Sequence, residues 1–203
     1  MDPVWFRRFA DIPGVQYQAS PTLDLSRLKR RDAVPGVYRF EGLEPSLFWE
    51  IQDGSTSQAP AAEHSLGDFR GATVEGVRKN LAEVLELPGE PSDYHFALQS
   101  TAAHLYSRRR DDPTVLDDVE RLCLLDLQLI ESCPSAITWD HEGHRSYYQV
   151  IAFSRLLRMY LTEGRISEAA AVADIAERFD AGGLPDVAEA RQRAAMLATE
   201  DIS

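Results

Sequence analysis

A short segment near residue 140 gathers the side chains that most readily bind metal ions. Asp140, His141, Glu142 and His144 lie within five residues, and imidazole and carboxylate groups are ligands of Zn²⁺. The segment lacks the two-histidine pattern of a zinc-binding helix, because its His-x-x-His pair encloses a glycine. A metal site needs three or four converging ligands. We therefore expect a polar loop without metal, and no cofactor elsewhere.

The other histidines and the two cysteines also give no catalytic pattern. His95 and His104 stand nine residues apart on one predicted helix, and so on opposite faces. Cys123 and Cys133 are ten residues apart, which on one helix separates them by about 15 Å, too far for a disulfide. No phosphate-binding, dinucleotide-binding or nucleophile-elbow motif is present. We expect a non-enzymatic protein; the alternative is an enzyme with a site between two modules.

Charge excludes some partners and suggests one alternative. The chain carries a net charge of −12, while residues 1–40 carry seven basic and four acidic side chains. An acidic protein is poorly suited to binding nucleic acid or acidic membranes. The basic run Arg27, Lys29, Arg30 and Arg31 lies among aromatic residues, a composition that can bind single-stranded nucleic acid. A nucleic-acid-linked regulator is therefore an alternative, although the aromatics also suit the core of a small sheet.

Hydrophobic runs in the chain are short. The longest, LCLLDLQLI, is interrupted by Asp126, and a membrane-spanning helix needs about 20 apolar residues. The first residues, MDPVWFRRFADIPG, lack the order of a signal peptide. We expect a cytoplasmic protein without a membrane partner.

Residues 1–53 are predicted to form a small mixed α/β module. Strand-like segments occur at residues 14–18, 36–40 and 46–52, two of them introduced by Pro-Gly. Residues 23–32 are long enough for a short helix between the first two strands. The pairing of these strands does not follow from the sequence.

Residues 54–70 are polar and lack hydrophobic periodicity, so we predict a linker or loop there. Residues 71–203 then show helical periodicity. Thr73 is the predicted cap of the first helix, and Ser92 or Asp93 that of the second. The third helix is apolar nearly all round and should lie between other helices. We predict six helices: between Thr73 and Pro88, at residues 92–110 and 113–132, two within 155–179, and at 184–197, with a loop at 135–146.

The two helices within residues 155–179 resemble a tetratricopeptide repeat, a helical hairpin of 34 residues. The resemblance rests on five positions that match the family's spacing: Leu156, Tyr160, Gly164, Ala169 and Ala176. Leu157 and Ala173 depart from the family pattern. A weaker copy around Tyr106 begins 54 residues earlier, so the array is irregular. The resemblance covers residues 92–199 and is close over 151–179.

The resemblance implies a fold and a binding face. We predict an α+β protein, mainly α, in which the N-terminal segment is followed by a bundle of about six helices in stacked hairpins. Repeat ligands usually lie against the first helix of each hairpin, which implies partner-binding residues at Ser100, His104, Arg108, Ser154, Arg158 and Thr162. Serine and a basic group in both helices suit an acidic or carboxylate-ended peptide. We therefore expect a protein-binding or regulatory adaptor; its oligomeric state does not follow from the sequence.

Overall fold

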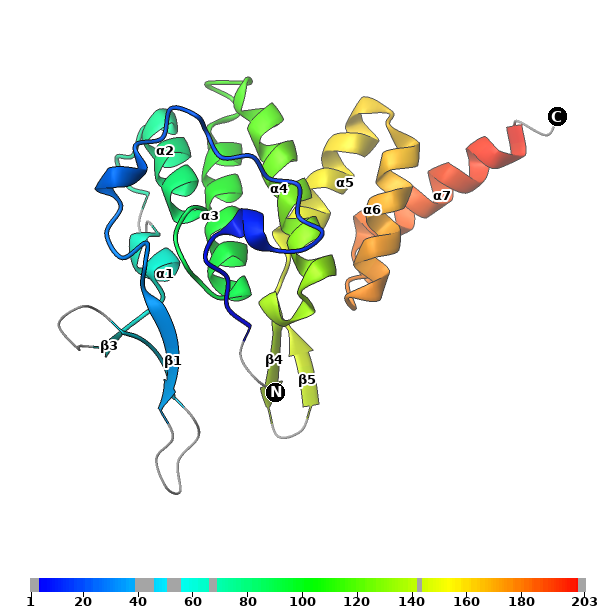
Figure 1. The fold of residues 1–203 in the computed structure, drawn as a ribbon. Coiled ribbons are helices and arrows are strands. Elements are labelled where there is room, and N and C mark those ends of the chain that lie inside the picture. The colour runs from blue at the N-terminus through cyan, green and yellow to red at the C-terminus, as the bar shows by residue number, and fades with distance from the viewer. Residues whose placement is uncertain (1–3, 39–45, 51–55, 66–68, 142–143, 201–203) are drawn as a thin grey trace.

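A computed structural model describes residues 4–38, 46–50, 56–65, 69–141 and 144–200. The fold is α+β and mainly helical, as predicted (Figure 1). The described residues contain seven α-helices: α1 (Pro60–His64), α2 (Val74–Val84), α3 (Pro91–Arg108), α4 (Val115–Ser132), α5 (Ile151–Glu163), α6 (Ile166–Arg178) and α7 (Pro185–Glu200). No helix in this part of the chain is both long and apolar enough to cross a bilayer.

The helices stack as consecutive hairpins. Each helix packs against the next one in the chain, from α1·α2 to α6·α7, with the α4·α5 contact joining two hairpins. In addition α3 contacts α1 and α5, and α5 contacts α7. Alternate helices therefore form one row, as expected when hairpins stack side by side. The apolar helix α4 packs between α3 and α5, which agrees with its predicted position.

Helix caps explain where α2 and α3 begin. The hydroxyl of Thr73 accepts a hydrogen bond from the Gly76 N–H at 3.0 Å, which confirms the predicted cap. The predicted cap of α3 was wrong, because the cap is Glu90. Pro91 occupies the first helical position, where a missing N–H is harmless. The Asp93 carboxylate accepts from the Glu90 N–H at 2.8 Å and completes a capping box.

The predicted loop at residues 135–146 is largely a β-hairpin. Strand β4 (Thr138–His141) pairs antiparallel with β5 (His144–Tyr147), with Thr138 opposite Tyr147. The Tyr148 N–H extends the pairing to the Ile137 carbonyl at 2.7 Å. Ile137 is fully buried and anchors the hairpin under the helices. The polar composition of this segment did not predict a hairpin. The hairpin is held in place by burial of its base, not of its whole length.

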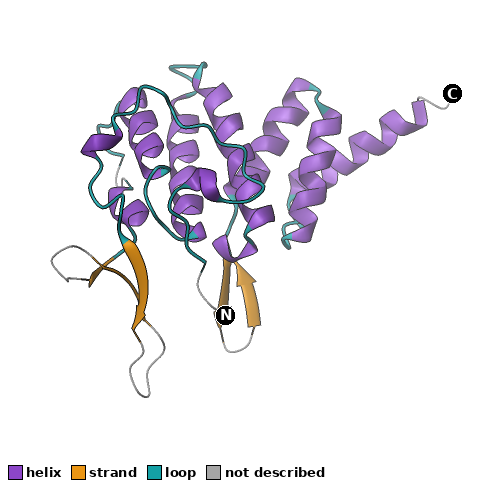
Figure 2. Cartoon of the chain, viewed as in Figure 1, coloured by secondary structure: helices purple, strands orange, loops and turns teal. Residues whose placement is uncertain are grey.

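The other strands form a small sheet beside the helices (Figure 2). Strand β1 (Val34–Tyr38) pairs with β2 (Ser46–Glu50), which pairs with β3 (Thr56–Ser57), all antiparallel. The strand predicted at residues 14–18 is wrong, since this segment pairs with no strand among the described residues. It runs across the helices instead. The helix predicted at 23–32 is reduced to a 3-10 turn at Leu25–Arg27.

The N-terminal segment packs into the core of the helices. Phe6 forms a β-bridge with Gly89, and the Phe9 N–H donates to the Leu85 carbonyl at 2.9 Å. Phe9 is fully buried and shares one hydrophobic cluster with Leu85 and Tyr94. The boundary at residues 54–70 stays a prediction, while these contacts join the first residues of the chain to the helical part.

Gly164 forms the turn between α5 and α6. It ends α5 with φ +73°, in the left-handed region that disfavours a side chain. Gly164→Ala should therefore lower the free energy of unfolding by about 1 kcal/mol. Gly183→Ala is the matched control, because Gly183 lacks a positive φ and has open space around it. Urea denaturation of both variants measures the difference, and equal stabilities would contradict the prediction.

Candidate functional site

Helices α3 and α5 form one continuous surface. The Ile151 N–H at the start of α5 donates to the Gln99 side chain at 2.9 Å. One turn later the Arg155 guanidinium lies 4.0 Å from the centre of the Tyr106 ring. Because both contacts advance in the same direction along the two helices, α3 and α5 run parallel. We call this surface the α3/α5 face.

Tyr106 holds two guanidinium groups at one end of this face. The Arg109 guanidinium lies 3.9 Å from the ring centre, and Arg155 lies 4.0 Å from it. Both distances are in the range of cation–π attraction. Arg109 also donates to the Tyr106 carbonyl at 2.8 Å. The Nε of Arg155 is buried and has no hydrogen-bond partner among the described residues. These three residues are the arginine–tyrosine cluster.

The arginines around this cluster have no carboxylate partners, in contrast to most others. Arg78 pairs with Asp118 at 2.6 Å, and Arg165 with Glu120 at 2.8 Å. In the described part of the chain no carboxylate oxygen lies within 4.0 Å of four arginines: Arg108, Arg109, Arg110 and Arg155. Three of them follow one another at the C-terminal end of α3, where the helix dipole favours positive charge. The result is a cationic patch on an acidic protein.

The hydroxyl groups predicted to bind a partner are bonded to their own helices. Ser100 donates to the Phe96 carbonyl at 2.6 Å, and Ser154 to the Ile151 carbonyl at 3.2 Å. Thr162 donates to the carbonyl of residue 158 at 2.7 Å. These bonds use the hydroxyl proton of each side chain, so its oxygen can still accept a hydrogen bond from a partner but cannot donate one.

The predicted basic groups of the site are separated by the structure. The His104 ring stacks on Phe69 at 4.9 Å, and its buried Nε2 has no partner among the described residues. Burial, and then the charge of Arg108, lower the pKa of His104. Arg158 lies 3.6 Å from Asp186 of α7. Arg108 therefore belongs to the cationic patch, whereas Arg158 lies against Asp186 of α7.

Sequence reasoning missed the arginine–tyrosine cluster. Arg109 follows Tyr106 by three residues, a spacing that places both on one side of a helix, and this signal was available. Arg155 is 49 residues from Tyr106, so only the packing of α5 on α3 brings it to the ring.

An exposed aromatic patch lies at the other end of the α3/α5 face, next to the hairpin. Phe96 of α3, Trp139 of β4 and Tyr148 after β5 are 44%, 42% and 42% exposed. The Tyr148 ring centre is 5.2 Å from that of Phe96 and 6.4 Å from that of Trp139. Clustered exposed apolar side chains are typical of interaction surfaces. The sequence did not reveal this patch, because Trp139 was assigned to a polar loop.

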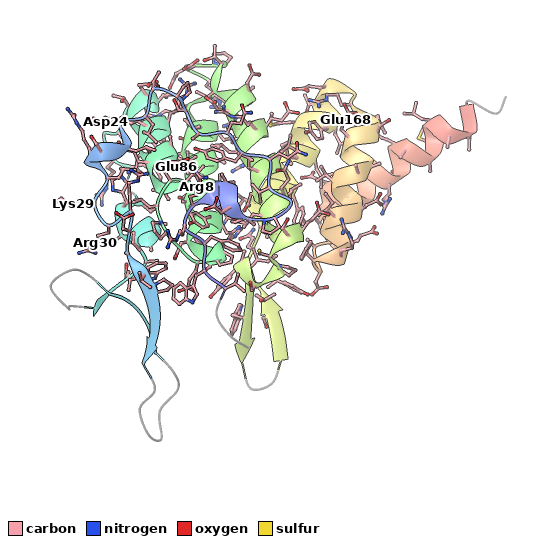
Figure 3. The ribbon with its side chains drawn as sticks, in the orientation of Figure 1. Arg8, Asp24, Lys29, Arg30, Glu86 and Glu168 are labelled. Atoms are coloured by element: carbon pink, nitrogen blue, oxygen red, sulfur yellow. The ribbon has the colours of Figure 1, made fainter. Side chains whose placement is uncertain are left out.

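The basic run of the nucleic-acid alternative is partly neutralised. Arg27 pairs with Asp24 at 3.0 Å, and Arg30 pairs with Glu63. Arg31 donates to the Leu25 carbonyl at 3.3 Å. Figure 3 shows Lys29 and Arg30 at the edge of the molecule, beside the turn that carries Asp24. These contacts reduce the charge that the run can offer to phosphate groups.

A buried polar pair lies between α3 and α4. The His95 Nδ1 is 2.7 Å from the Asp126 Oδ1, and both residues are at most 1% exposed. Burial raises the pKa of Asp126, and the bond to His95 opposes this effect. Cys123, one turn before Asp126, has its pKa raised to about 12 by burial. Burial therefore keeps this thiol protonated and lowers its reactivity.

That residues 140–144 bind no metal stays a prediction. Glu142 lies outside the described residues, and the side chains of Asp140, His141 and His144 are not described. Among the side chains that are described, no three histidine, cysteine, aspartate or glutamate residues converge as a metal site would require.

Glu86 is a buried carboxylate beneath the N-terminal segment, near Arg8 (Figure 3). It is 5% exposed, and its Oε1 has no partner among the described residues. Burial raises the pKa of Glu86, while Arg8 and Arg31 oppose the rise. A raised pKa favours the protonated group in the folded state, so its stabilising contribution is present in acid and is lost as pH rises.

Glu86→Gln should therefore increase stability at pH 7. The variant stays neutral where the native carboxylate ionises. The difference should vanish below about pH 4, where Glu86 is protonated in both folded and unfolded states. Urea midpoints at pH 7 and pH 3.5 test this, with Glu75→Gln, whose side chain is 85% exposed, as control. An equal midpoint for wild type and Glu86→Gln at pH 7 would contradict the prediction.

No family model, curated protein or solved structure matches this chain.

Proposed function

We propose that this protein is a non-enzymatic adaptor of the cytoplasm that binds an acidic segment of a partner protein on the α3/α5 face. The observation that carries the proposal is the cationic patch, in which four neighbouring arginines have no carboxylate partner among the described residues. Guanidinium groups bind carboxylates through charge-assisted hydrogen bonds. Arginines left without such partners in an acidic protein are suited to carboxylates of another chain.

Two further observations support a protein partner. The aromatic patch offers exposed apolar contacts at the other end of the same face, and aromatic residues together with arginine are enriched in protein interfaces. The stacked hairpins resemble tetratricopeptide repeats, whose ligands usually lie against the first helix of each hairpin. In this chain those helices are α3 and α5.

Site-specific photo-crosslinking in native lysate tests the proposal. A photo-reactive residue at Ser107, which is exposed on α3, should capture a partner. The same residue at Ala171, exposed on α6, is the matched control and should not capture it. The captured protein should contain an acidic segment at the crosslinked peptide.

Charge variants test the role of the cationic patch. Arg109→Ala with Arg155→Ala should reduce capture at Ser107 by about tenfold, the effect of losing two charge-assisted contacts of modest strength. Arg178→Ala, on α6 and paired with Glu131, is the control of similar charge. Capture that ignores Arg109 and Arg155, or a crosslinked peptide without acidic residues, would refute the proposal.

A further inference from the structure

The chain between Val15 and Asp24 forms a strap across the helices (Figure 2). A cavity of about 1150 Å³ lies between this strap and helices α2, α3 and α4. Its floor consists of leucines from the three helices: Leu81, Leu85, Leu105, Leu122 and Leu125. A second cavity of about 330 Å³ lies against α4 and shares Gln16, Arg121 and Leu125 with the first. We call the two together the strap groove, which lies against residues 117–128 of α4.

The strap has the residue pattern of a β-strand. Apolar residues alternate with polar ones through ten positions: Val15, Tyr17, Ala19, Pro21 and Leu23 against Gln16, Gln18, Ser20, Thr22 and Asp24. A period of two is that of a strand with one apolar face. Val15, Tyr17 and Leu23 are half-buried, whereas Ala19 and Pro21 are exposed. Val15 and Tyr17 pack against the hydrophobic core, so the apolar face is covered at the start of the strap but not in its middle.

The backbone in the middle of the strap is not paired within the described part of the chain. The Gln16 N–H donates to the Gln128 side chain at 2.8 Å, and the Leu23 N–H donates to the Ser20 carbonyl at 3.2 Å. Between these two contacts, the N–H groups of residues 17–20 donate to no other described residue. Backbone groups without partners can form hydrogen bonds with an added strand.

The charged side chains that line the groove differ between its two cavities. The large cavity is lined by equal numbers of acidic and basic side chains, among them Asp118, which pairs with both Arg78 and Arg121. The charged side chains that line the small cavity are Asp117, Glu120 and Arg121, and Arg121 is paired with Asp118. Glu120 is paired with Arg165, whereas Asp117 has no cation within 4.0 Å among the described residues. The small cavity beside Asp117 is therefore suited to a positively charged group.

We propose that the strap groove binds an extended peptide segment of a second partner. The segment pairs as a β-strand with the backbone of residues 17–20 and packs alternate apolar side chains over Leu122 and Leu125. A basic residue of the segment lies against Asp117. This site goes beyond the proposed function, because it lies on the strap and on other helix surfaces than the α3/α5 face. Two separate surfaces would let the protein bridge two partners.

Peptide pools of defined pattern test the site with the full chain. The first pool holds ten-residue peptides that begin with lysine and alternate apolar with polar residues. The second pool has the same composition with the apolar residues grouped together. A third and a fourth pool repeat the first with either the odd-numbered or the even-numbered backbone nitrogens methylated, so that each removes the N–H donors of one strand edge. The first pool should bind at least about tenfold more tightly than the second, because only alternation matches the groove. Methylation on one of the two edges should abolish this binding.

Variants of the strap distinguish strand pairing from other modes of binding. Gln18 and Ala19 are exposed, and adjacent N–H groups of an extended chain point to opposite edges. Gln18→Pro and Ala19→Pro should therefore act differently, one abolishing binding of the first pool and the other preserving it. Asp117→Lys should weaken that pool about fivefold, the effect of one exposed ion pair, and glutamate-headed peptides should restore binding.

Three results would overturn the site: equal binding of the alternating and grouped pools, equal effects of the two proline variants, or indifference to Asp117→Lys. Arg109→Ala separates this proposal from the proposed function. It should leave binding of the first pool unchanged while it weakens capture at Ser107. Failure at one surface is thus distinguishable from failure at the other.

Discussion

Replacing Asp126 with alanine should lower the free energy of unfolding by about 1 to 3 kcal/mol, the usual effect of leaving a buried hydrogen-bonding group without its partner. The substitution leaves the His95 Nδ1 without its 2.7 Å contact. The His95 Nε2 already has no partner among the described residues, so both ring nitrogens would be buried without a hydrogen bond. Urea denaturation at pH 7 measures the loss.

A double variant shows how much of the loss comes from leaving His95 without its partner. His95→Leu with Asp126→Leu should recover most of the loss, because replacing both members of a buried pair with apolar groups is often neutral. Leu124→Ala, at a position that is 37% exposed on the same helix, is the control and should change stability by less than about 1 kcal/mol. A loss below about 1 kcal/mol for Asp126→Ala would mean that water reaches the pair.

Phe9→Ala should destabilise the whole protein, by about 3 to 5 kcal/mol. Phe9 is fully buried, and its ring lies 5.5 Å from that of Tyr94 and 5.6 Å from that of Tyr17. The cavity left by the substitution would open between the N-terminal segment and α3. In a Trp139→Phe background, tryptophan fluorescence reports on Trp5 and Trp49, and far-ultraviolet circular dichroism reports on the helices. Both signals should shift together to lower urea concentration.

The matched control is Val4→Ala, at a position that is 45% exposed. It should change stability by no more than about 0.5 kcal/mol. If fluorescence alone shifted in Phe9→Ala while the helical signal kept its midpoint, the N-terminal segment would be a separately folding unit. That outcome would contradict the shared core seen in the structure.

The helices were predictable because their signals are local. The Thr73 cap, the Gly164 turn and the apolar stripes each involve residues within a few positions of one another, so they can be read without knowing the fold. The cap of α3 was misplaced by two or three residues, because aspartate at residue 93 supports the capping box from inside the helix.

The remaining features depend on contacts that are distant in the chain. Residues 14–18 were predicted to form a strand, but a strand needs a partner strand, and this segment packs against the helices instead. The hairpin at residues 138–147 is held by the burial of Ile137, which its polar sequence does not show. The arginine–tyrosine cluster depends on the packing of α5 against α3. Secondary-structure propensity and hydrophobic periodicity carry no information on contacts between residues that are distant in the chain.

The path of the strap also determines the order in which the protein can mature. Each helix packs on its neighbour in the chain, whereas Gln16 meets Gln128, 112 residues later. A ribosome that adds about 5 to 20 residues per second needs roughly 6 to 20 seconds to make that stretch. The strap is thus synthesised well before the part of α4 that it contacts, and it cannot reach its final position until residue 128 has been added. Throughout that interval its alternating apolar face is open to chaperones, and to the nascent strands of neighbouring chains on the same messenger RNA.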